Sequence, residues 1–396
     1  MRTAEADSPE RLGPPPGIAG YRLLNLLEPP RPRRIAASPR APLFVVATVC
    51  VGAFMGQLDA SIVSVALPRM SAQLHAPVGL VQWVSLSYVL TLVALVVPIG
   101  AWADAVGRKS LYVGGFAVFT LASAACAVAP DVAVLCGCRV VQAVGAALMQ
   151  ANSVALIAAA TPRDRLGRMV GLQAAAQATG LAAGPAVGGF LLAAGSWRWL
   201  FLVNVPAGVI GVVTAAMMLP RSRELSAARP AGAARLMRFV LSVLRAPRLA
   251  RILLTSFAGY AMLFCVLVAI PLLLHGRGTS SVVTGLTIAT VPVVIGLTAP
   301  VAGHLSDRAP QWVASAGFGL TLASLCVIAL LRPGGVGLVG LLALAGAGLG
   351  SFTPANNRAV MLAAPRGAAS TAAGLLNMTR GLGTAAGTAL AVFLLG

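Results

Sequence analysis

The sequence predicts an all-α integral membrane protein built from two repeated bundles of helices. Three observations support this prediction: 58% of the 396 residues are hydrophobic, 10% are charged, and the apolar residues gather in long runs. A run of about 20 apolar residues is the length that a helix needs to cross a bilayer. A soluble domain cannot bury so much apolar surface, so we expect a multi-pass membrane protein. Almost every basic residue is Arg, and Ala, Gly and Pro are abundant, as in proteins from GC-rich bacterial genomes, so we expect a bacterial cell membrane.

The elements follow from these runs. Residues 1–42 are rich in Pro and Arg and contain no apolar run typical of a signal peptide, so we expect a disordered basic tail. About eleven candidate spans come next, at residues 43–67, 81–103, 111–129, 132–160, 168–194, 198–219, 250–274, 282–305, 312–331, 336–360 and 368–396.

A polar linker at residues 221–249 divides the spans into two groups, with a short basic amphipathic helix expected around residues 236–244. The prediction is therefore a six-helix N-terminal bundle at residues 43–220 and a C-terminal bundle of about five helices at residues 250–396. The six cysteines lie in or beside apolar runs without a metal-binding spacing, so we expect no metal site.

The basic residues indicate the orientation. The net charge of +19 comes from arginines that gather in alternate gaps between the spans, including Arg108 with Lys109, and Arg163 with Arg165. The positive-inside rule places these gaps, the linker and the N-terminal tail in the cytoplasm. With eleven spans, the C-terminus would lie outside. The basic balance therefore reports topology, and we expect no binding to nucleic acid.

The two halves resemble each other at an offset of about 200 residues. The pattern Gly100-x-x-x-Asp104 recurs as Gly303-x-x-x-Asp307, and "GAALMQAN" at 145–152 resembles "GAGLGSFTPAN" at 346–356. Repeats in the same orientation are typical of secondary transporters, which bind their substrate between the halves.

Several motifs together resemble one protein family. "GAWADAVGRKS" (100–110) resembles the loop motif G-x-x-x-D-x-x-G-R-[KR] of the major facilitator superfamily, and "CRVVQAVGAA" (138–147) resembles its fourth-span motif. "GLAAGPAVGG" (180–189) resembles the fifth-span motif of its antiporters. "LDASIVSVALP" (58–68) and "WRWLFLVNVP" (197–206) resemble signatures of a drug:proton antiporter subgroup that usually has fourteen spans.

The resemblance implies a fold of the major facilitator type, here without the two central spans of that subgroup and without a final span. It also implies transport by alternating access, driven by the proton gradient with no cofactor. We expect that a twelfth span, if appended, would raise stability and efflux.

The loop motif is predicted to latch the cytoplasmic end. Gly100 and Gly107 permit close helix approach and a tight turn, and Asp104 can pair with bases or cap a neighbouring helix. The gating residues expected are Gly100, Asp104, Gly107, Arg108, Lys109, Asp307 and Arg308. The alternative is a solvated loop whose bases only set the orientation.

Charges at membrane depth predict the proton site. Asp59 is the acidic residue well inside a span, and Arg139 lies at a matching depth in the fourth span. A pairing of the two, direct or through water and Gln142, would give a carboxylate that can exchange a proton. The alternative is that Arg139 binds backbone carbonyls and Asp59 caps a local kink.

The fifth span is predicted to act as a hinge and a seal. Gly180, Gly184 and Gly188 make a smooth packing face, and Pro185, followed by Gly189, removes a helix hydrogen bond. The alternative is a packing face with no role in transport.

The substrate cavity is expected to be mostly apolar with few polar groups. The candidates are Gln57, Trp83, Gln142, Asn152, Gln173, Gln177, Asn377 and Arg380. With one membrane carboxylate, a neutral or monocationic substrate is favoured over a dicationic one, while Arg380 could pair with an anionic group.

The function predicted is proton-coupled efflux of small lipophilic drugs or antibiotics by a protein embedded in lipid, which we expect to be monomeric. The alternatives are a proton-coupled transporter of a small metabolite and a truncated, non-transporting homologue. An enzyme is not expected, because His75, His275 and His304 are scattered without a partner at a catalytic spacing.

Overall fold

The computed structural model describes residues 40–162, 166–221, 247–306, 310–363 and 369–395, with three isolated residues before these. The regular structure in these ranges is helical, as the apolar runs predict. The expected tail, apart from its last residues, and the expected amphipathic helix at 236–244 lie outside the described residues.

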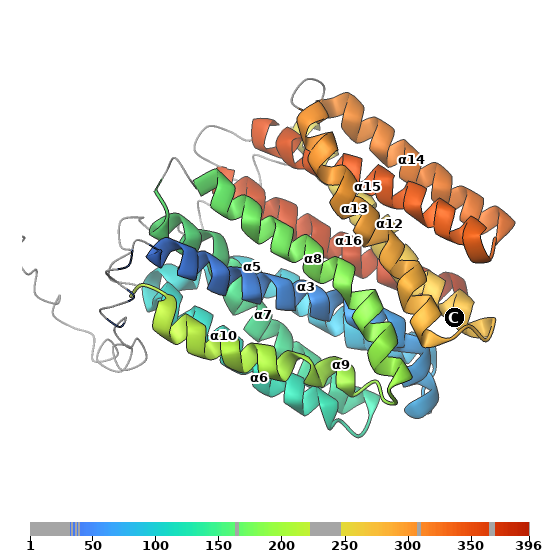
Figure 1. Ribbon diagram of the computed structural model, residues 1–396, viewed down its shortest axis with the longest axis horizontal. Coiled ribbons are helices and arrows are strands. Elements are labelled where there is room, and N and C mark those ends of the chain that lie inside the picture. The colour runs from blue at the N-terminus through green and yellow to red at the C-terminus, as the bar shows by residue number, and fades with distance from the viewer. Residues whose placement is uncertain are drawn as a thin grey trace, which may run out of the picture.

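The first half of the chain folds into a bundle of closely packed helices (Figure 1). Its helices are α3 (Ala41–Gln73), α4 (Val78–Val81), α5 (Trp83–Val106), α6 (Arg108–Ala127), α7 (Val132–Ala160), α8 (Leu166–Ala193), α9 (Trp199–Leu202) and α10 (Asn204–Met218). The second half contributes α12 (Pro247–Gly276), α13 (Ser281–Ser306), α14 (Pro310–Leu331), α15 (Gly335–Ala363) and α16 (Ala369–Leu395).

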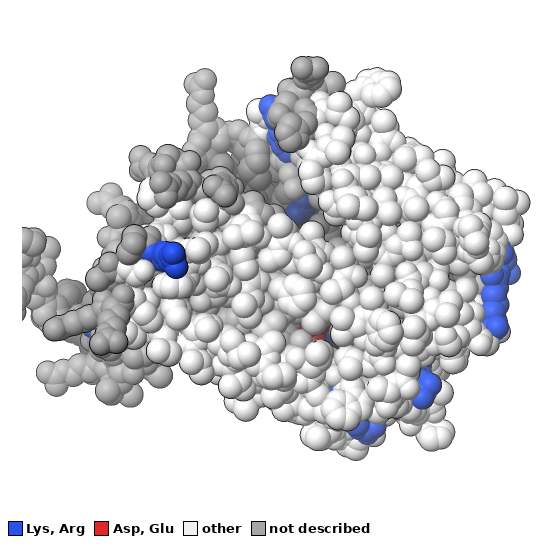
Figure 2. All heavy atoms as spheres, in the orientation of Figure 1, with Lys and Arg blue, Asp and Glu red and all other residues white. Residues whose placement is uncertain are grey.

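The long helices lie side by side along the longest axis of the molecule, and short connections reverse the chain between them (Figure 1). We call the end at which α3 begins end A and the opposite end, where the C-terminus lies, end B. On the face shown in Figure 2, the middle of the helices is almost free of charge, and basic side chains appear mainly towards the two ends.

Ten helical stretches in the described part of the chain are long and apolar enough to cross a membrane. The sequence predicts about eleven, and the additional one is α16, which has 27 residues but is not among these ten. The helix predicted at 198–219 is divided into α9 and α10, because the break comes just before Pro206, which has no backbone N–H to donate.

Local sequence explains several helix ends. Asp131 caps α7, since its carboxylate accepts a hydrogen bond of 2.8 Å from the backbone N–H of Val134. Between α5 and α6 the chain turns at Gly107, whose φ of 117° is a conformation that other residues rarely adopt.

α3 continues six residues beyond its predicted end, to Gln73, with Pro68 inside it.

The predicted repeat is visible in the packing of helix pairs. α6 crosses α7 with backbones in contact: a Cβ built on Gly115 would lie 2.9 Å from the carbonyl oxygen of Gly145. α14 crosses α15 in the same way, since a Cβ on Gly317 would lie 2.5 Å from the carbonyl oxygen of Gly348. Each pair comes from the corresponding place in its half of the chain, about 200 residues apart.

A second pair of crossings repeats as well. Gly180 of α8 packs against the backbone of Phe54 in α3, and Gly383 of α16 packs against the backbone of Phe257 in α12. Small residues at such positions let helix backbones approach where lipid gives no hydrophobic drive for association. The two halves thus share these helix contacts, whereas α10, which packs against α6 and α3, has no counterpart among the described helices of the second half.

Candidate functional site

A fully buried ion pair lies at the centre of the first bundle. Nη1 of Arg139 in α7 lies 2.5 Å from Oδ2 of Asp59 in α3, and the two side chains are 1% and 0% exposed. The structure therefore brings together the two charged residues that the sequence places at matching depth. The pairing is direct, and Arg139 also donates through Nε to the backbone carbonyl of Val84 at 3.0 Å.

Two amides complete the environment of the carboxylate. Oδ1 of Asp59 accepts hydrogen bonds from Nδ2 of Asn204 at 2.9 Å and from Nε2 of Gln142 at 3.0 Å. The oxygen of Gln142 in turn accepts from Nη1 of Arg139 at 2.6 Å, and its nitrogen also reaches the hydroxyl of Ser123 at 2.8 Å. Both carboxylate oxygens are therefore occupied by donors from α7 and α10, and the network extends to α6.

Tyr88 of α5 separates this cluster from open space. The guanidinium carbon of Arg139 lies 4.1 Å from the centroid of the Tyr88 ring, a cation–π contact, and 5.6 Å from that of Phe201. Tyr88 is 1% exposed, and its hydroxyl has no hydrogen-bond partner among the described residues. The ring of Tyr88 covers the guanidinium on one side and lines a cavity.

The cluster can hold an ionised carboxylate inside the bundle. Such a group in a membrane protein needs a partner, and Asp59 has a cation and two amide donors. Because these groups come from three helices, the pair depends on the arrangement of α3, α7 and α10.

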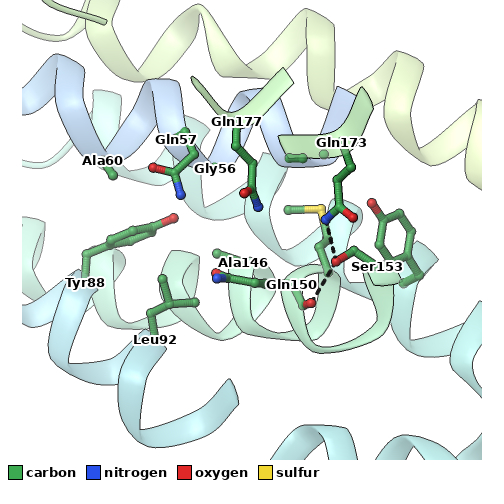
Figure 3. A pocket seen from close by; sticks show the side chains of 14 residues that line it. Gly56, Gln57, Ala60, Tyr88, Leu92, Ala146, Gln150, Ser153, Gln173 and Gln177 are labelled. Atoms are coloured by element: carbon green, nitrogen blue, oxygen red, sulfur yellow. Dashed lines mark hydrogen bonds between the residues drawn. The ribbon is translucent and has the colours of Figure 1, made fainter. Parts of the chain in front are cut away.

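The first cavity lies within the N-terminal bundle, between α3 and α8 on one side and α5, α6 and α7 on the other (Figure 3). Gln57, Gln150 and Gln177 turn their amides into it. Gln173 also lines it and donates to the hydroxyl of Ser153 at 2.9 Å. The volume of about 50 Å³ has room for a few water molecules in this conformation.

A second cavity of about 100 Å³ lies between the two bundles and shares part of its wall with the first. Gln57, Tyr88, Gln150 and Gln177 belong to both linings. From the second bundle it is lined by Tyr260 and Phe264 of α12 and by Asn377, Arg380, Gly381 and Thr384 of α16.

Five of the eight cavity residues expected from the sequence line these cavities: Gln57, Gln173, Gln177, Asn377 and Arg380. The other three belong to neither lining. Gln142 is engaged with Asp59, Asn152 donates to the carbonyl of Leu148 in its own helix at 2.8 Å, and Trp83 is 48% exposed at the start of α5. The two amides therefore form hydrogen bonds inside the bundle, and the Trp83 ring lies at its edge.

The loop motif is described only in part. Lys109 at the start of α6 is fully buried, and Arg108 is half-buried. No described atom lies within 4 Å of a Cβ built on Gly100, so the expected close helix approach there stays a prediction. The side chain of Asp104 lies outside the described residues, as do Asp307 and Arg308.

α8 presents glycines to two different helices. Gly184 and Gly188 face Ser61 and Ile62 of α3, as Gly180 faces Phe54, so one side of α8 follows α3 closely. This close packing occurs with Pro185 inside the helix.

The other glycine of this motif joins the two bundles. A Cβ built on Gly189 would lie 2.5 Å from the carbonyl oxygen of Ser281 and 3.1 Å from Cα of Gly285 in α13. These residues lie near end B, so α8 and α13 touch backbone to backbone there. The expected role of this motif as a hinge and a seal stays a prediction.

Sequence reasoning overlooked three residues of the buried cluster: Tyr88, Ser123 and Asn204. Asn204 lies in "WRWLFLVNVP", a stretch already recognisable as a signature, and a polar residue inside a span is the signal that could have identified it. Tyr88 and Ser123 carry no such signal, because uncharged aromatic and hydroxyl residues are common in membrane helices.

The fold and the central cavity define a two-bundle membrane transporter with a buried ion pair. The sequence profile of the Major Facilitator Superfamily matches residues 49–388. This chain belongs to that superfamily.

Known relatives include transporters of different kinds. The chain is 28% identical to the uncharacterized transporter YebQ of Escherichia coli (strain K12) over 88% of both chains. It is also 28% identical to the riboflavin transporter RibZ of Clostridioides difficile (strain 630), over 87% of this chain and 86% of the relative. A multidrug resistance protein B homolog of Mycobacterium tuberculosis is 38% identical, over 46% of this chain and 34% of the relative.

Solved structures share the fold. A bacterial homolog of the human lysosomal transporter Spinster, in an inward-facing and unoccupied conformation, matches with a TM-score of 0.72 at 18% identity, over 89% of this chain and 82% of that chain.

Proposed function

We propose that this transporter exports small organic molecules across the cytoplasmic membrane in exchange for protons, and that Asp59 carries the proton. The observation that carries the proposal is the buried Asp59–Arg139 pair, with both carboxylate oxygens occupied, directly behind the wall of the central cavity. Within the described residues, Asp59 is the only carboxylate at the centre of the helices.

In this mechanism Asp59 alternates between an ionised state paired with Arg139 and a protonated state. With the bundles closed, Asp59 stays ionised because Arg139, Gln142 and Asn204 satisfy it. Movement of α3 against α7 admits water, the carboxylate takes a proton, and Arg139 loses its counter-charge. The free energy of burying a charge without its partner, several kcal/mol, then favours the other arrangement of the helices.

The direction of transport rests on the fifth-span motif and on the relatives. "GLAAGPAVGG" in α8 resembles the antiporter motif, and one relative is a multidrug resistance protein. The positive-inside rule orients end A, which carries the N-terminal tail and the linker, towards the cytoplasm. On this assignment residues 43–220 form the N-terminal bundle, residues 221–249 a cytoplasmic linker, and residues 250–396 the C-terminal bundle.

The test is efflux in a bacterial host that lacks its own pumps. Cells that express the chain should tolerate higher concentrations of some compounds in an inhibitory-concentration panel, and an uncoupler should abolish the difference. Asp59→Asn should remove the resistance when variants are compared at matched membrane abundance, because the amide is nearly the same size but takes no proton. Asp131→Asn is the matched control, since Asp131 is exposed and caps α7, and Asn caps equally well.

Uncoupler-sensitive resistance that survives in Asp59→Asn would place the proton site elsewhere. Loss of resistance in both variants would point to a general effect on the protein and would also contradict the assignment.

A second candidate function is the transport of a metabolite. The riboflavin transporter is 28% identical over 87% of this chain, which is as strong a resemblance as that to the multidrug resistance protein Stp of Mycobacterium tuberculosis, 28% identical over 89%. Uptake and counterflow of radiolabelled riboflavin in cells or proteoliposomes discriminates the two, since a drug exporter gives no saturable counterflow with riboflavin.

A further inference from the structure

The charged residues of the molecule leave the central cavity with one net positive charge. Arg380 of α16 is the only charged residue among those that line the two cavities. Of the ten acidic residues in the chain, Asp59 is neutralised by Arg139 behind Tyr88, and Asp131 lies at the exposed start of α7. In the sequence, the remaining eight fall in the tail, in the linker or near the ends of predicted spans, and the structure describes none of their side chains.

Arg380 is held in place by contacts with α12 and α15, and its Nε–H has no hydrogen-bond acceptor among the described residues. Its guanidinium lies 5.1 Å from the centroid of the Tyr260 ring and donates through one terminal nitrogen to Oδ1 of Asn357 in α15. Its Nε is buried and has no hydrogen-bond partner among the described residues. A cation held in this way between the bundles, without a described counter-charge, is an unfavourable arrangement unless an anion or water occupies the cavity.

The second unpartnered group faces the same cavity. The hydroxyl of Tyr88 is buried, has no partner among the described residues and belongs to the lining that also contains Arg380. Between them lie the amides of Gln57, Gln177 and Asn377 and an apolar wall from α5 and α12. The lining thus offers a fixed cation, several neutral hydrogen-bonding groups and apolar surface.

Comparison of the two halves shows that only the second bundle has a cation at this position of the cavity wall. At the offset that relates Phe54 to Phe257, Arg380 corresponds to Gln177, and both line the cavity. The same position is therefore neutral in one bundle and positively charged in the other, although the surrounding helix contacts repeat.

We propose that the cavity binds organic anions: molecules with one carboxylate or similar oxyanion that pairs with Arg380, and with an apolar or aromatic body that lies against Tyr88 and Tyr260. The proposal names the substrate class of the transporter and rests on the proposed function. It differs from the neutral or monocationic substrate expected from the sequence, because Asp59 lies behind Tyr88 and does not face the cavity.

The test compares ligands that share a body and differ in charge. Tritiated 2-naphthoate is bound to the purified full chain in lipid nanodiscs and displaced by unlabelled 2-naphthoate, 2-naphthamide or 2-naphthylmethylammonium. Fluorescein and rhodamine 123, an anion and a cation with the same xanthene ring system, are tested by fluorescence polarisation. In each series the anion should bind about tenfold more tightly than its uncharged or cationic counterpart, as expected for a hydrogen-bonded ion pair.

Three variants separate binding from folding. Arg380→Gln should weaken binding of the anions about tenfold and change binding of 2-naphthamide by less than about twofold. Arg380→Lys keeps the charge without the planar fork and should retain the preference for anions at reduced affinity. Arg251→Gln is the control, because it removes an exposed arginine of α12 near end A that lines neither cavity.

The proposal is overturned if no anion binds more tightly than its counterpart to the wild-type protein. It is also overturned if Arg380→Gln lowers the binding of anion and amide equally, since that result indicates a structural arginine. Efflux of rhodamine 123 but not fluorescein, dependent on Asp59, would contradict the anion site and leave the proposed function intact. Binding of fluorescein through Arg380 without uncoupler-sensitive efflux would support the anion site and contradict the proposed function.

Discussion

At the scale of single residues, the molecule is organised around one carboxylate that has no free acceptor oxygen. Arg139 occupies Oδ2 of Asp59, and Gln142 and Asn204 occupy Oδ1. A buried ion pair of this kind adds little net stability, but removing one partner leaves the other charge buried and unpaired.

That asymmetry gives a stability prediction. Arg139→Gln should lower the free energy of unfolding by about 3–5 kcal/mol, because Asp59 is left without its counter-charge. The double variant Asp59→Asn/Arg139→Gln should recover much of this loss, since no charge then remains to be buried. Thermal unfolding in detergent, followed by size-exclusion chromatography, measures both variants.

Arg198→Gln serves as the control, because this half-buried arginine at end B is bonded to the carbonyl of Ala129 and has no described acidic partner. If the double variant is less stable than Arg139→Gln, the pair is not the source of the effect.

The sequence was informative about this cluster through its two charged residues and through Gln142, which lies one helical turn after Arg139 in the same motif. A charge inside an apolar run is rare enough to identify Asp59 and Arg139 from the sequence alone. Asn204 and Tyr88 are no different in type from many polar residues that merely join helices, so only the fold reveals that they meet the pair. The same limit applies to Trp83 and Asn152, whose residue types suit a cavity that their positions do not reach.

At the scale of elements, α8 is one of the helices through which the two bundles touch, together with α5, which contacts α16, and α3, which contacts α12. One side follows α3 through Gly180, Gly184 and Gly188, and Gly189 meets Gly285 of α13. The spacing of glycines in α8 was visible in the sequence, but Gly285 is not part of a four-residue glycine series in α13 and becomes recognisable only once the two helices are placed together.

Enlarging Gly285 should separate the bundles at end B. A Cβ built there would lie 3.0 Å from Cα of Gly189, so Gly285→Leu leaves no space for the backbone contact. We expect faster labelling of cysteines introduced in the cavity wall by a reagent added from end B, and loss of transport. Gly296→Leu is the matched control on the same helix, because a Cβ there meets nothing within 4 Å. Equal labelling in both variants would show that this contact is not a seal.

At the scale of the whole molecule, the two halves repeat their helix crossings but not their buried charged residues. The glycine crossings of α6 with α7 and of α14 with α15 correspond, as do those of α3 with α8 and of α12 with α16. The repeat and the helical membrane fold were predictable, because both depend on apolar runs and small residues spread along the chain. The positions that correspond to Asp59 and Arg139 are Met262 and Leu342, so the buried ion pair, the proposed proton site, belongs to one bundle.

The orientation of the whole molecule can be tested by labelling. In a variant without the native cysteines, Arg251→Cys at end A should react with a membrane-impermeant maleimide only after the cells are permeabilised. Arg332→Cys at end B should react in intact cells, because the positive-inside rule places end A in the cytoplasm. The opposite pattern would reverse the assignment.

The central claim is that Asp59 itself takes up and releases a proton, and infrared difference spectroscopy measures this without knowledge of the substrate. The purified protein in lipid is titrated from neutral to acidic pH, and the C=O stretch of protonated carboxyl groups is recorded. We expect a band of a buried carboxylic acid in the wild-type protein and in Asp131→Asn, and its absence in Asp59→Asn. The same band at full intensity in Asp59→Asn would contradict the account.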